Sequence, residues 1–224
     1  MDVNNREEKE RKLVRELSRI FGERFESVMD LLGDPPNIAN VPPEYWRQFS
    51  AELVTAISNA LNETFYEQFT ESLEEFGLSA DTGQASEAAL DFVRRYSFNL
   101  VKDIEATTIT ALRKEINFYF ETGDMSINDL AGRLYRWYSP VRAEMIAITE
   151  TTRAAVQGEL DTVMRIASET GTIFEPVWQT SNDERVCIIC GPLHGKVIDD
   201  GFFPPAHPRC RCWVNHRIKD FDNG

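Results

Sequence analysis

The residues of this chain that are best suited to metal chemistry are gathered in its last quarter. All four cysteines and all three histidines of the 224-residue sequence lie between Cys187 and His216. They run as Cys187-Ile-Ile-Cys190, then sixteen residues, then His207-Pro-Arg-Cys210-Arg-Cys212. A Cys-x-x-Cys turn followed about 15–20 residues later by a second ligand group is the spacing of a tetrahedral zinc site. The sequence therefore predicts one structural zinc ion per chain.

Five candidate ligands compete for four coordination positions. Cys187, Cys190 and Cys210 are the strongest candidates, and the fourth ligand is either His207 or Cys212. Side chains two residues apart on a strand point to the same face, so Cys210 and Cys212 can both reach one ion. His207 lies on a turn before a proline and can reach the same ion, so the sequence leaves both ligand sets open.

Other uses of the cysteines have less support from the sequence. Two disulfides would suit a secreted domain, but the first ten residues are highly charged and contain no apolar signal segment. No apolar run approaches the ~20 residues that a membrane span needs, so we expect no membrane partner. A reducing cytoplasm would keep the thiols available for a metal. Free or redox-active thiols are the remaining alternative.

Polar and aromatic residues around the candidate ligands are expected to play structural roles. Asp183 and Arg185 flank the first cysteine at alternate positions and should orient its turn through an ion pair or backbone hydrogen bonds. His194 and His216 are expected to be solvated surface residues. Trp178 should cover the core of the cysteine segment.

The elements that must position these residues are mainly helical. Apolar residues repeat at three- and four-residue spacings as far as Gly171, which predicts amphipathic helices. Gly33, Gly77 and Gly123 are expected to end three of them. The expected helices span residues 5–32, 44–76, 86–122, 127–138 and 140–170. Segment 106–110 is β-branched and weak in helix propensity, so a break there would not be surprising.

After Gly171 the apolar pattern changes to the alternation of strands. Segments 172–180, 196–198 and 211–216 are the predicted strands, and turns rich in glycine and proline join them. The predicted fold class is therefore α+β. It consists mainly of long α-helices in an elongated helical bundle, with a small C-terminal β-rich zinc-knuckle module.

Several stretches of the sequence together form a recognisable combination. They are Thr149-Glu150-Thr-Thr-Arg153, Trp178, Asp183-Glu-Arg185-Val-Cys187-Ile-Ile-Cys190, Leu193-His-Gly195 and His207-Pro-Arg-Cys210-Arg-Cys212. In combination they resemble the phage Mu F-like head-morphogenesis family, over roughly residues 125–215. We expect Glu150 and Arg153 to contact the cysteine segment from the last helix.

The resemblance suggests a division of the chain into three parts. Residues 1–123 form a helical N-terminal region, in which 1–33 either packs on the body or stands off as an arm. Residues 124–172 are the helical part of the Mu F-like domain, and 173–224 are the Cys/His-rich β module.

The resemblance also implies a function, that of a minor head or capsid protein of a tailed phage or prophage. Such a protein acts structurally at the portal or inner capsid, with portal protein and/or capsid proteins as partners. It would be found in the host cytoplasm during assembly and then in the virion head. No catalytic activity is expected.

Two alternatives come from the residues themselves. One is a metal-dependent enzyme of nuclease type in which His207 activates water. The net charge of −13 makes direct nucleic-acid binding unlikely, because that binding rests on basic side chains. The other alternative is a zinc-bearing adaptor without a phage role.

Overall fold

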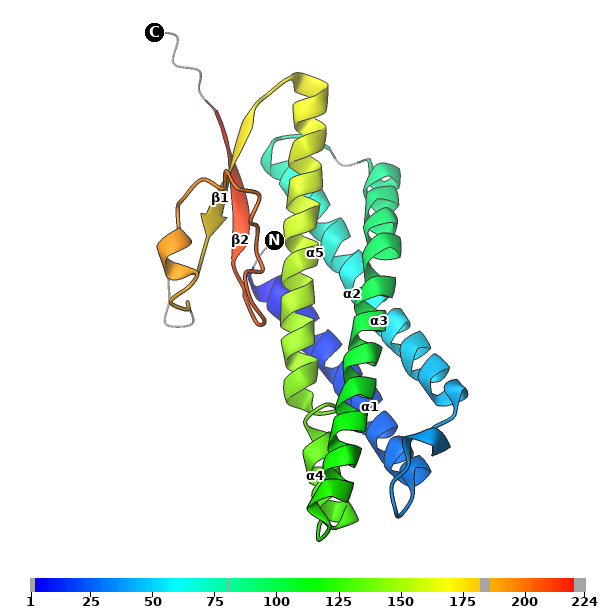
Figure 1. The fold of residues 1–224 in the computed structure, drawn as a ribbon. Helices are drawn as coiled ribbons and strands as arrows, with labels where there is room; N and C mark the ends of the chain where they lie inside the picture. The colour runs from blue at the N-terminus through cyan, green and yellow to red at the C-terminus, as the bar shows by residue number, and fades with distance from the viewer. Residues whose placement is uncertain (1–2, 80, 182–185, 220–224) are drawn as a thin grey trace. The chain divides into compact units, whose positions relative to one another are not determined.

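The computed structural model describes residues 3–79, 81–181 and 186–219. This part of the chain consists of α-helices followed by a two-stranded sheet near the C-terminus (Figure 1). The helices are α1 (Val3–Leu32), α2 (Pro43–Glu75), α3 (Thr82–Thr122), α4 (Ile127–Tyr135) and α5 (Pro140–Thr170), and the strands are β1 (Phe174–Gln179) and β2 (Trp213–Ile218). The predicted fold class, long helices with a small β module at the cysteines, is confirmed.

Glycine ends four of the helices, and three of these glycines, Gly33, Gly77 and Gly123, were predicted to do so. Gly33, Gly77, Gly123 and Gly171 directly follow or nearly follow a helix and all have φ between 72° and 75°. Glycine adopts this left-handed conformation without the steric cost that a Cβ would bring. The start of α4 is fixed by a capping box, in which the Ser126 side chain accepts from the Asp129 amide and the Asp129 carboxylate accepts from the Ser126 amide.

Helix α3 is continuous through the β-branched segment where a break was anticipated. The hydroxyl groups of Thr107 and Thr108 donate to carbonyls three or four residues earlier in the helix. The buried guanidinium of Arg142 then donates to the Thr108 hydroxyl at 2.8 Å, to the Thr107 hydroxyl at 2.9 Å and to the Ile104 carbonyl at 3.2 Å. Tertiary hydrogen bonds therefore outweigh the weak helix propensity of this segment.

The described residues form two compact units. The first unit is drawn from the ranges Met1–Glu10, Ala60–Phe92 and Ile148–Gly224, and the second from Arg11–Asn59 and Val93–Ala147. All four cysteines belong to the first unit. The three-part division that the sequence suggested stays a prediction.

The second unit has an aromatic core that includes part of α1. The Phe49 ring lies 6.1 Å from the rings of both Phe21 and Tyr138, and the hydroxyls of Tyr45 and Tyr138 are 3.2 Å apart. Further apolar side chains of α1 are buried as well, at Leu13, Leu17, Ile20, Val28 and Leu32, so this stretch of α1 packs into a core.

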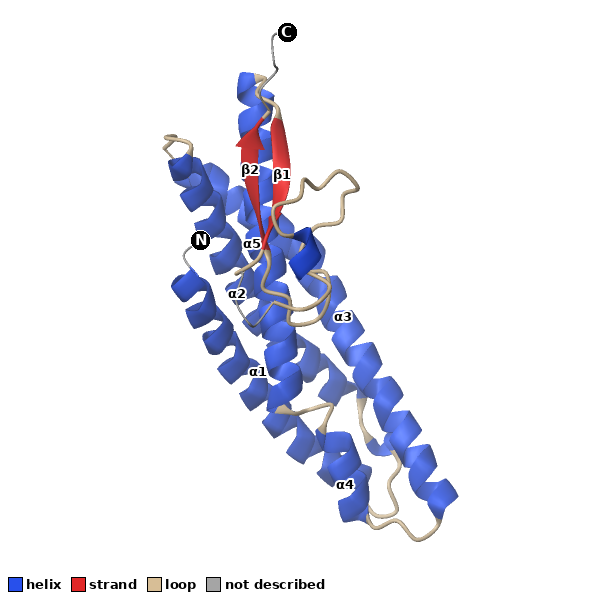
Figure 2. Cartoon of the chain, turned by 90° about the vertical axis from the view of Figure 1, so that its left-hand side faces the viewer, coloured by secondary structure: helices blue, strands red, loops and turns tan. Residues whose placement is uncertain are grey.

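In the first unit, α5 packs closely against α2 on one side and carries the sheet on the other (Figure 1 and Figure 2). The Thr162 hydroxyl donates to the Phe69 carbonyl of α2 at 3.2 Å. Strands β1 and β2 are antiparallel, with Phe174 opposite Ile218. The predicted strand at 196–198 is only an isolated bridge, from Val197 to Val177 of β1. None of the helices in the described ranges combines the length and the apolar character that a bilayer span requires.

The contact between α5 and α2 depends on the absence of a side chain at Gly158. A methyl group at this position would lie 2.7 Å from the Phe65 carbonyl oxygen, which is backbone and cannot rotate away. We expect Gly158→Ala to lower the free energy of unfolding by about 1–3 kcal/mol. Gly132→Ala in α4 is the matched control, because no atom beyond its chain neighbours and its own helix backbone lies within 4 Å of the added methyl group. This control should raise the stability by about 0.4–1 kcal/mol. Urea unfolding of both variants measures whether each substitution raises or lowers the free energy of unfolding. A stabilising effect of Gly158→Ala would contradict this packing.

Candidate metal centre

The five candidate ligands lie together in the first unit, in two overlapping groups. One group is Cys187, Cys190 and His207, and the other is Cys190, Cys210 and Cys212. Within each group the potential ligand atoms all lie within 4.8 Å of one another. Cys190 belongs to both groups, so the five residues form one set, called the Cys/His cluster below. Such a set of sulfur and imidazole donors can hold a metal ion.

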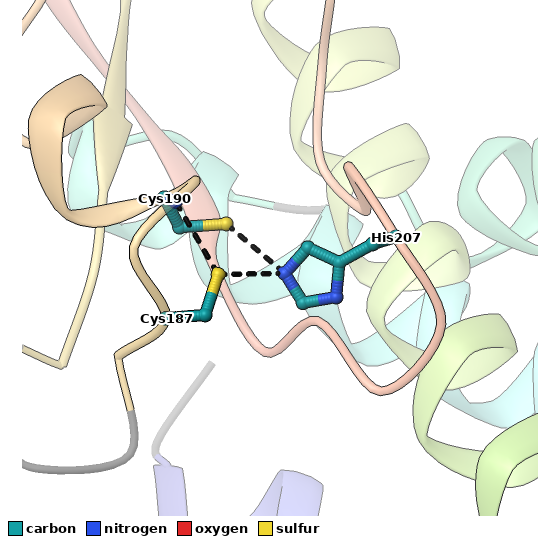
Figure 3. A group of neighbouring side chains, drawn as sticks. All are labelled: Cys187, Cys190 and His207. Carbon is teal, nitrogen blue, oxygen red and sulfur yellow. Dashed lines mark hydrogen bonds between the residues drawn. The ribbon is translucent and has the colours of Figure 1, made fainter.

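Figure 3 shows the first group, in which the imidazole of His207 faces two sulfur atoms. His207 Nε2 lies 3.0 Å from Cys187 Sγ and 3.3 Å from Cys190 Sγ. The Cys190 sulfur is also 3.8 Å from the sulfur of Cys210. Since a disulfide bond is only about 2.05 Å long, these are free thiols.

The imidazole of His207 is held in the orientation that a metal ligand needs. Its Nδ1 atom is 2.8 Å from the Pro208 carbonyl, which can only accept, so Nδ1 carries the hydrogen. Nε2 then presents its lone pair to the Cys187 and Cys190 sulfurs. The Pro208 carbonyl and the Cys187 thiol also raise the pKa of His207.

The thiols differ widely in acidity because they are crowded together. The Cys212 side chain donates a hydrogen bond that lowers the pKa of Cys210 to about 5. Burial, together with the neighbouring Cys210, raises the pKa of Cys190 to about 12. Hydrogen bonding to Cys210 and burial likewise raise the pKa of Cys212. Without a cation, burial and the neighbouring thiols therefore oppose ionisation of Cys190 and Cys212.

Trp178 was predicted to cover the core of the cysteine segment, and in the structure it is itself buried in that core. Its side chain is 1% exposed and packs with Cys190, Cys210 and Cys212. The Phe202 ring stacks on it, with 5.9 Å between centroids. The backbone of Trp178 is also fixed, because its carbonyl accepts from Gly195 at 2.8 Å and its amide donates to Lys196 at 2.9 Å.

The prediction that His216 is a solvated surface residue is wrong. Its side chain is 3% exposed, and Nδ1 lies 2.9 Å from Glu159 Oε1. His216 is in β2, which lies along α5, so the side of β2 that carries His216 is covered. His194 is an exposed residue, but its Nδ1 accepts from the Thr180 amide at 3.1 Å.

Glu159 organises a buried polar network that sequence reasoning missed. Gln68 of α2 donates to Glu159 Oε2 at 3.1 Å, and the Ser72 hydroxyl donates to the same oxygen. Burial by itself would raise the pKa of Glu159, but the hydrogen bonds from His216 and Ser72 lower it overall. The sequence does contain a sign that Glu159 is buried, because this residue falls on the apolar stripe of α5 with Val156 and Val163. A carboxylate there must have buried partners.

Two residues of α5, Glu150 and Arg153, were predicted to contact the cysteine segment. Glu150 is buried and Arg153 Nε lies 3.2 Å from its carboxylate. The neighbouring Thr149 hydroxyl accepts from the Arg209 amide at 2.9 Å, which ties α5 to the turn between His207 and Cys210. Asp183 and Arg185 lie outside the described residues, and the expected contact of Glu150 and Arg153 with the module stays a prediction.

A double-mutant cycle tests whether the Glu159–His216 pair fastens the sheet to α5. We expect Glu159→Gln and His216→Asn each to destabilise the protein by about 1–3 kcal/mol, because each leaves a buried partner unsatisfied. The coupling energy should be about 0.5–3 kcal/mol. The exposed pair Glu175–Arg217 in the same sheet is the control, with an expected coupling of about 0–1 kcal/mol. Equal coupling in the two cycles, measured by urea unfolding, would count against a special role for the buried pair.

Comparison with known proteins identifies the family. A family model described as Phage Mu protein F like protein matches residues 104–215, which is half of the chain and includes the whole Cys/His cluster. The match begins within α3, earlier than the resemblance seen in the sequence. Searches of curated proteins and of solved structures return no significant match. The family indicates a protein of the phage head-morphogenesis type. The chain belongs to the phage Mu protein F-like family.

Proposed function

We propose that this protein is a minor head component of a tailed phage or prophage, and that it acts as a structural part at the portal or inner capsid. The observation that carries the proposal is the family match over residues 104–215, which spans both helical scaffold and Cys/His cluster. The protein would assemble in the host cytoplasm and remain in the virion head. Its role would be to make contacts, with the C-terminal module held together by one zinc ion.

The chemistry and spacing of the donors support zinc. A tetrahedral ion with metal–sulfur bonds of about 2.3 Å holds its sulfur ligands about 3.8 Å apart, which matches the 3.8 Å between the sulfurs of Cys190 and Cys210. A cavity of about 60 Å³ is lined by all five residues of the cluster. Thiolate and imidazole donors together favour zinc over the hard cations.

We propose Cys187, Cys190, His207 and Cys210 as the four ligands. His207 Nε2 lies nearest to Cys187 and Cys190, with its lone pair toward them, and Cys210 is the cysteine at 3.8 Å from Cys190. Cys212 is then a neighbour that supports the site without binding the ion. Zinc would supply the positive charge that lets several thiolates coexist, and its binding would release protons.

A site with four protein ligands favours a structural role over catalysis. Catalytic zinc keeps an open position for water or substrate, and a closed site does not. The alternative of a nuclease that uses His207 finds no support in the family match. The net charge of −13 also argues for a protein partner rather than DNA. Segment 60–92 alone contains eight acidic residues and no basic ones, so we expect the partner surface to be neutral or basic.

The zinc proposal predicts one ion per chain in protein purified under reducing conditions. Chelation should expose residues 174–218 to protease while most of the helical signal in circular dichroism persists, because the small module depends on metal for stability. His207→Asn should lower the zinc affinity strongly, and Cys212→Ser should change it little if the proposed ligand set is right. Elemental analysis that finds no stoichiometric zinc would contradict the proposal.

The assembly proposal predicts association with portal or capsid protein. Co-expression of the full chain with each protein, followed by size-exclusion chromatography, should give a complex. We expect Cys190→Ser to retain the complex, because residues 1–123 are proposed to carry the contact. Loss of the complex in that variant would move the contact to the module. The absence of any complex with either protein would overturn the assembly role.

A further inference from the structure

The start of α1 contacts the turn that carries two of the cysteines. Arg6 Nη2 donates to the carbonyl of Arg211 at 2.8 Å, and Arg211 is flanked by Cys210 and Cys212. Glu10, one turn further along α1, accepts from Arg211 Nε at 3.0 Å and pairs with Nη2 at 2.9 Å. These contacts join residues about 200 positions apart, and all of them lie within the first unit. Sequence reasoning did not find them.

The charged side chains of Arg6 and Glu10 are buried, and the cost of burying them calls for a physical explanation. Arg6 is 6% exposed and Glu10 is 3% exposed. Arg6 Nε and Glu10 Oε1 have no hydrogen-bond partner among the described residues and lie 3.8 Å apart. A buried charge that is incompletely paired is costly. A positive charge near a helix N-terminus is also unfavourable toward the helix dipole. Local helix stability therefore does not explain Arg6.

The positive charge of Arg6 would offset the negative charge of a zinc–thiolate site. Zn²⁺ with three thiolates and a neutral imidazole carries a net charge of −1. Arg6 and Arg211, partly offset by Glu10, contribute a net +1 beside it. Arg6 lines the same small cavity as the cysteines and His207.

We propose that Arg6 is a positioning residue of the metal site, which holds the Cys210–Arg211–Cys212 turn through the Arg211 carbonyl and balances the charge of the bound thiolates. The inference rests on the proposed zinc site. It makes the first turns of α1 part of that site, so that zinc binding and the docking of α1 stabilise each other reciprocally.

Zinc affinity in Arg6 variants tests the proposal. We expect Arg6→Met to weaken zinc binding about 10–100-fold in competition with a chromophoric chelator, as is typical for residues that support metal ligands. Arg6→Lys should recover part of the loss, because it restores the charge but not the planar guanidinium. Arg15→Met is the control, since it removes an exposed positive charge from the same helix. Unchanged affinity in Arg6→Met, with one zinc bound, would overturn this inference while leaving the zinc site intact.

Hydrogen exchange of the unaltered protein gives a second test that needs no variant to fold. Zinc should slow amide exchange in residues 5–12 of α1 and leave α4 unchanged. Equal exchange at the start of α1 with and without bound zinc would overturn the coupling. If the unaltered protein binds no zinc, both this inference and the zinc site fail. These outcomes distinguish a failure of the proposed role of Arg6 from a failure of the zinc site.

Discussion

The structure of the C-terminal module depends on how four sulfur atoms and one imidazole share a very small space. The side chains of Cys190, Cys210 and Cys212 are buried around Trp178, where extra negative charge is costly. Burial and the neighbouring Cys210 raise the pKa of Cys190 to about 12, so the surroundings of this thiol oppose its ionisation. A divalent cation reverses this effect by stabilising the thiolates. The short strands β1 and β2 could not supply this stability from their own apolar area.

The helices of the first unit give the module a fixed place through a few polar contacts. Glu159 of α5 bonds to His216 of β2 and to Gln68 of α2, so one buried carboxylate connects the sheet to two helices. The Thr149 hydroxyl accepts a hydrogen bond from the Arg209 amide, in the turn between His207 and Cys210. The match to the phage Mu protein F-like family, over residues 104–215, covers α4, α5 and the whole Cys/His cluster.

Local patterns predicted much of this architecture, and long-range contacts escaped prediction. Glycines at the helix ends and the spacing of the cysteines depend only on near neighbours, so the helices and the cluster were foreseeable. The pairing of Glu159 with His216 was not, because a lone histidine in a strand looks the same in sequence whether or not a carboxylate covers it. Likewise, the spacing of Arg6 and Glu10 at i and i+4 contains no sign of their contact with Arg211, about 200 residues away. The unbroken α3 depends on Arg142, which lies in another helix.

X-ray absorption at the zinc edge of the purified protein tests directly for a structural zinc ion in the Cys/His cluster. We expect a four-coordinate ion with three sulfur neighbours at about 2.3 Å and one nitrogen neighbour at about 2.0 Å. A shell made only of nitrogen and oxygen, or one that contains a bound water in place of the histidine, would contradict it.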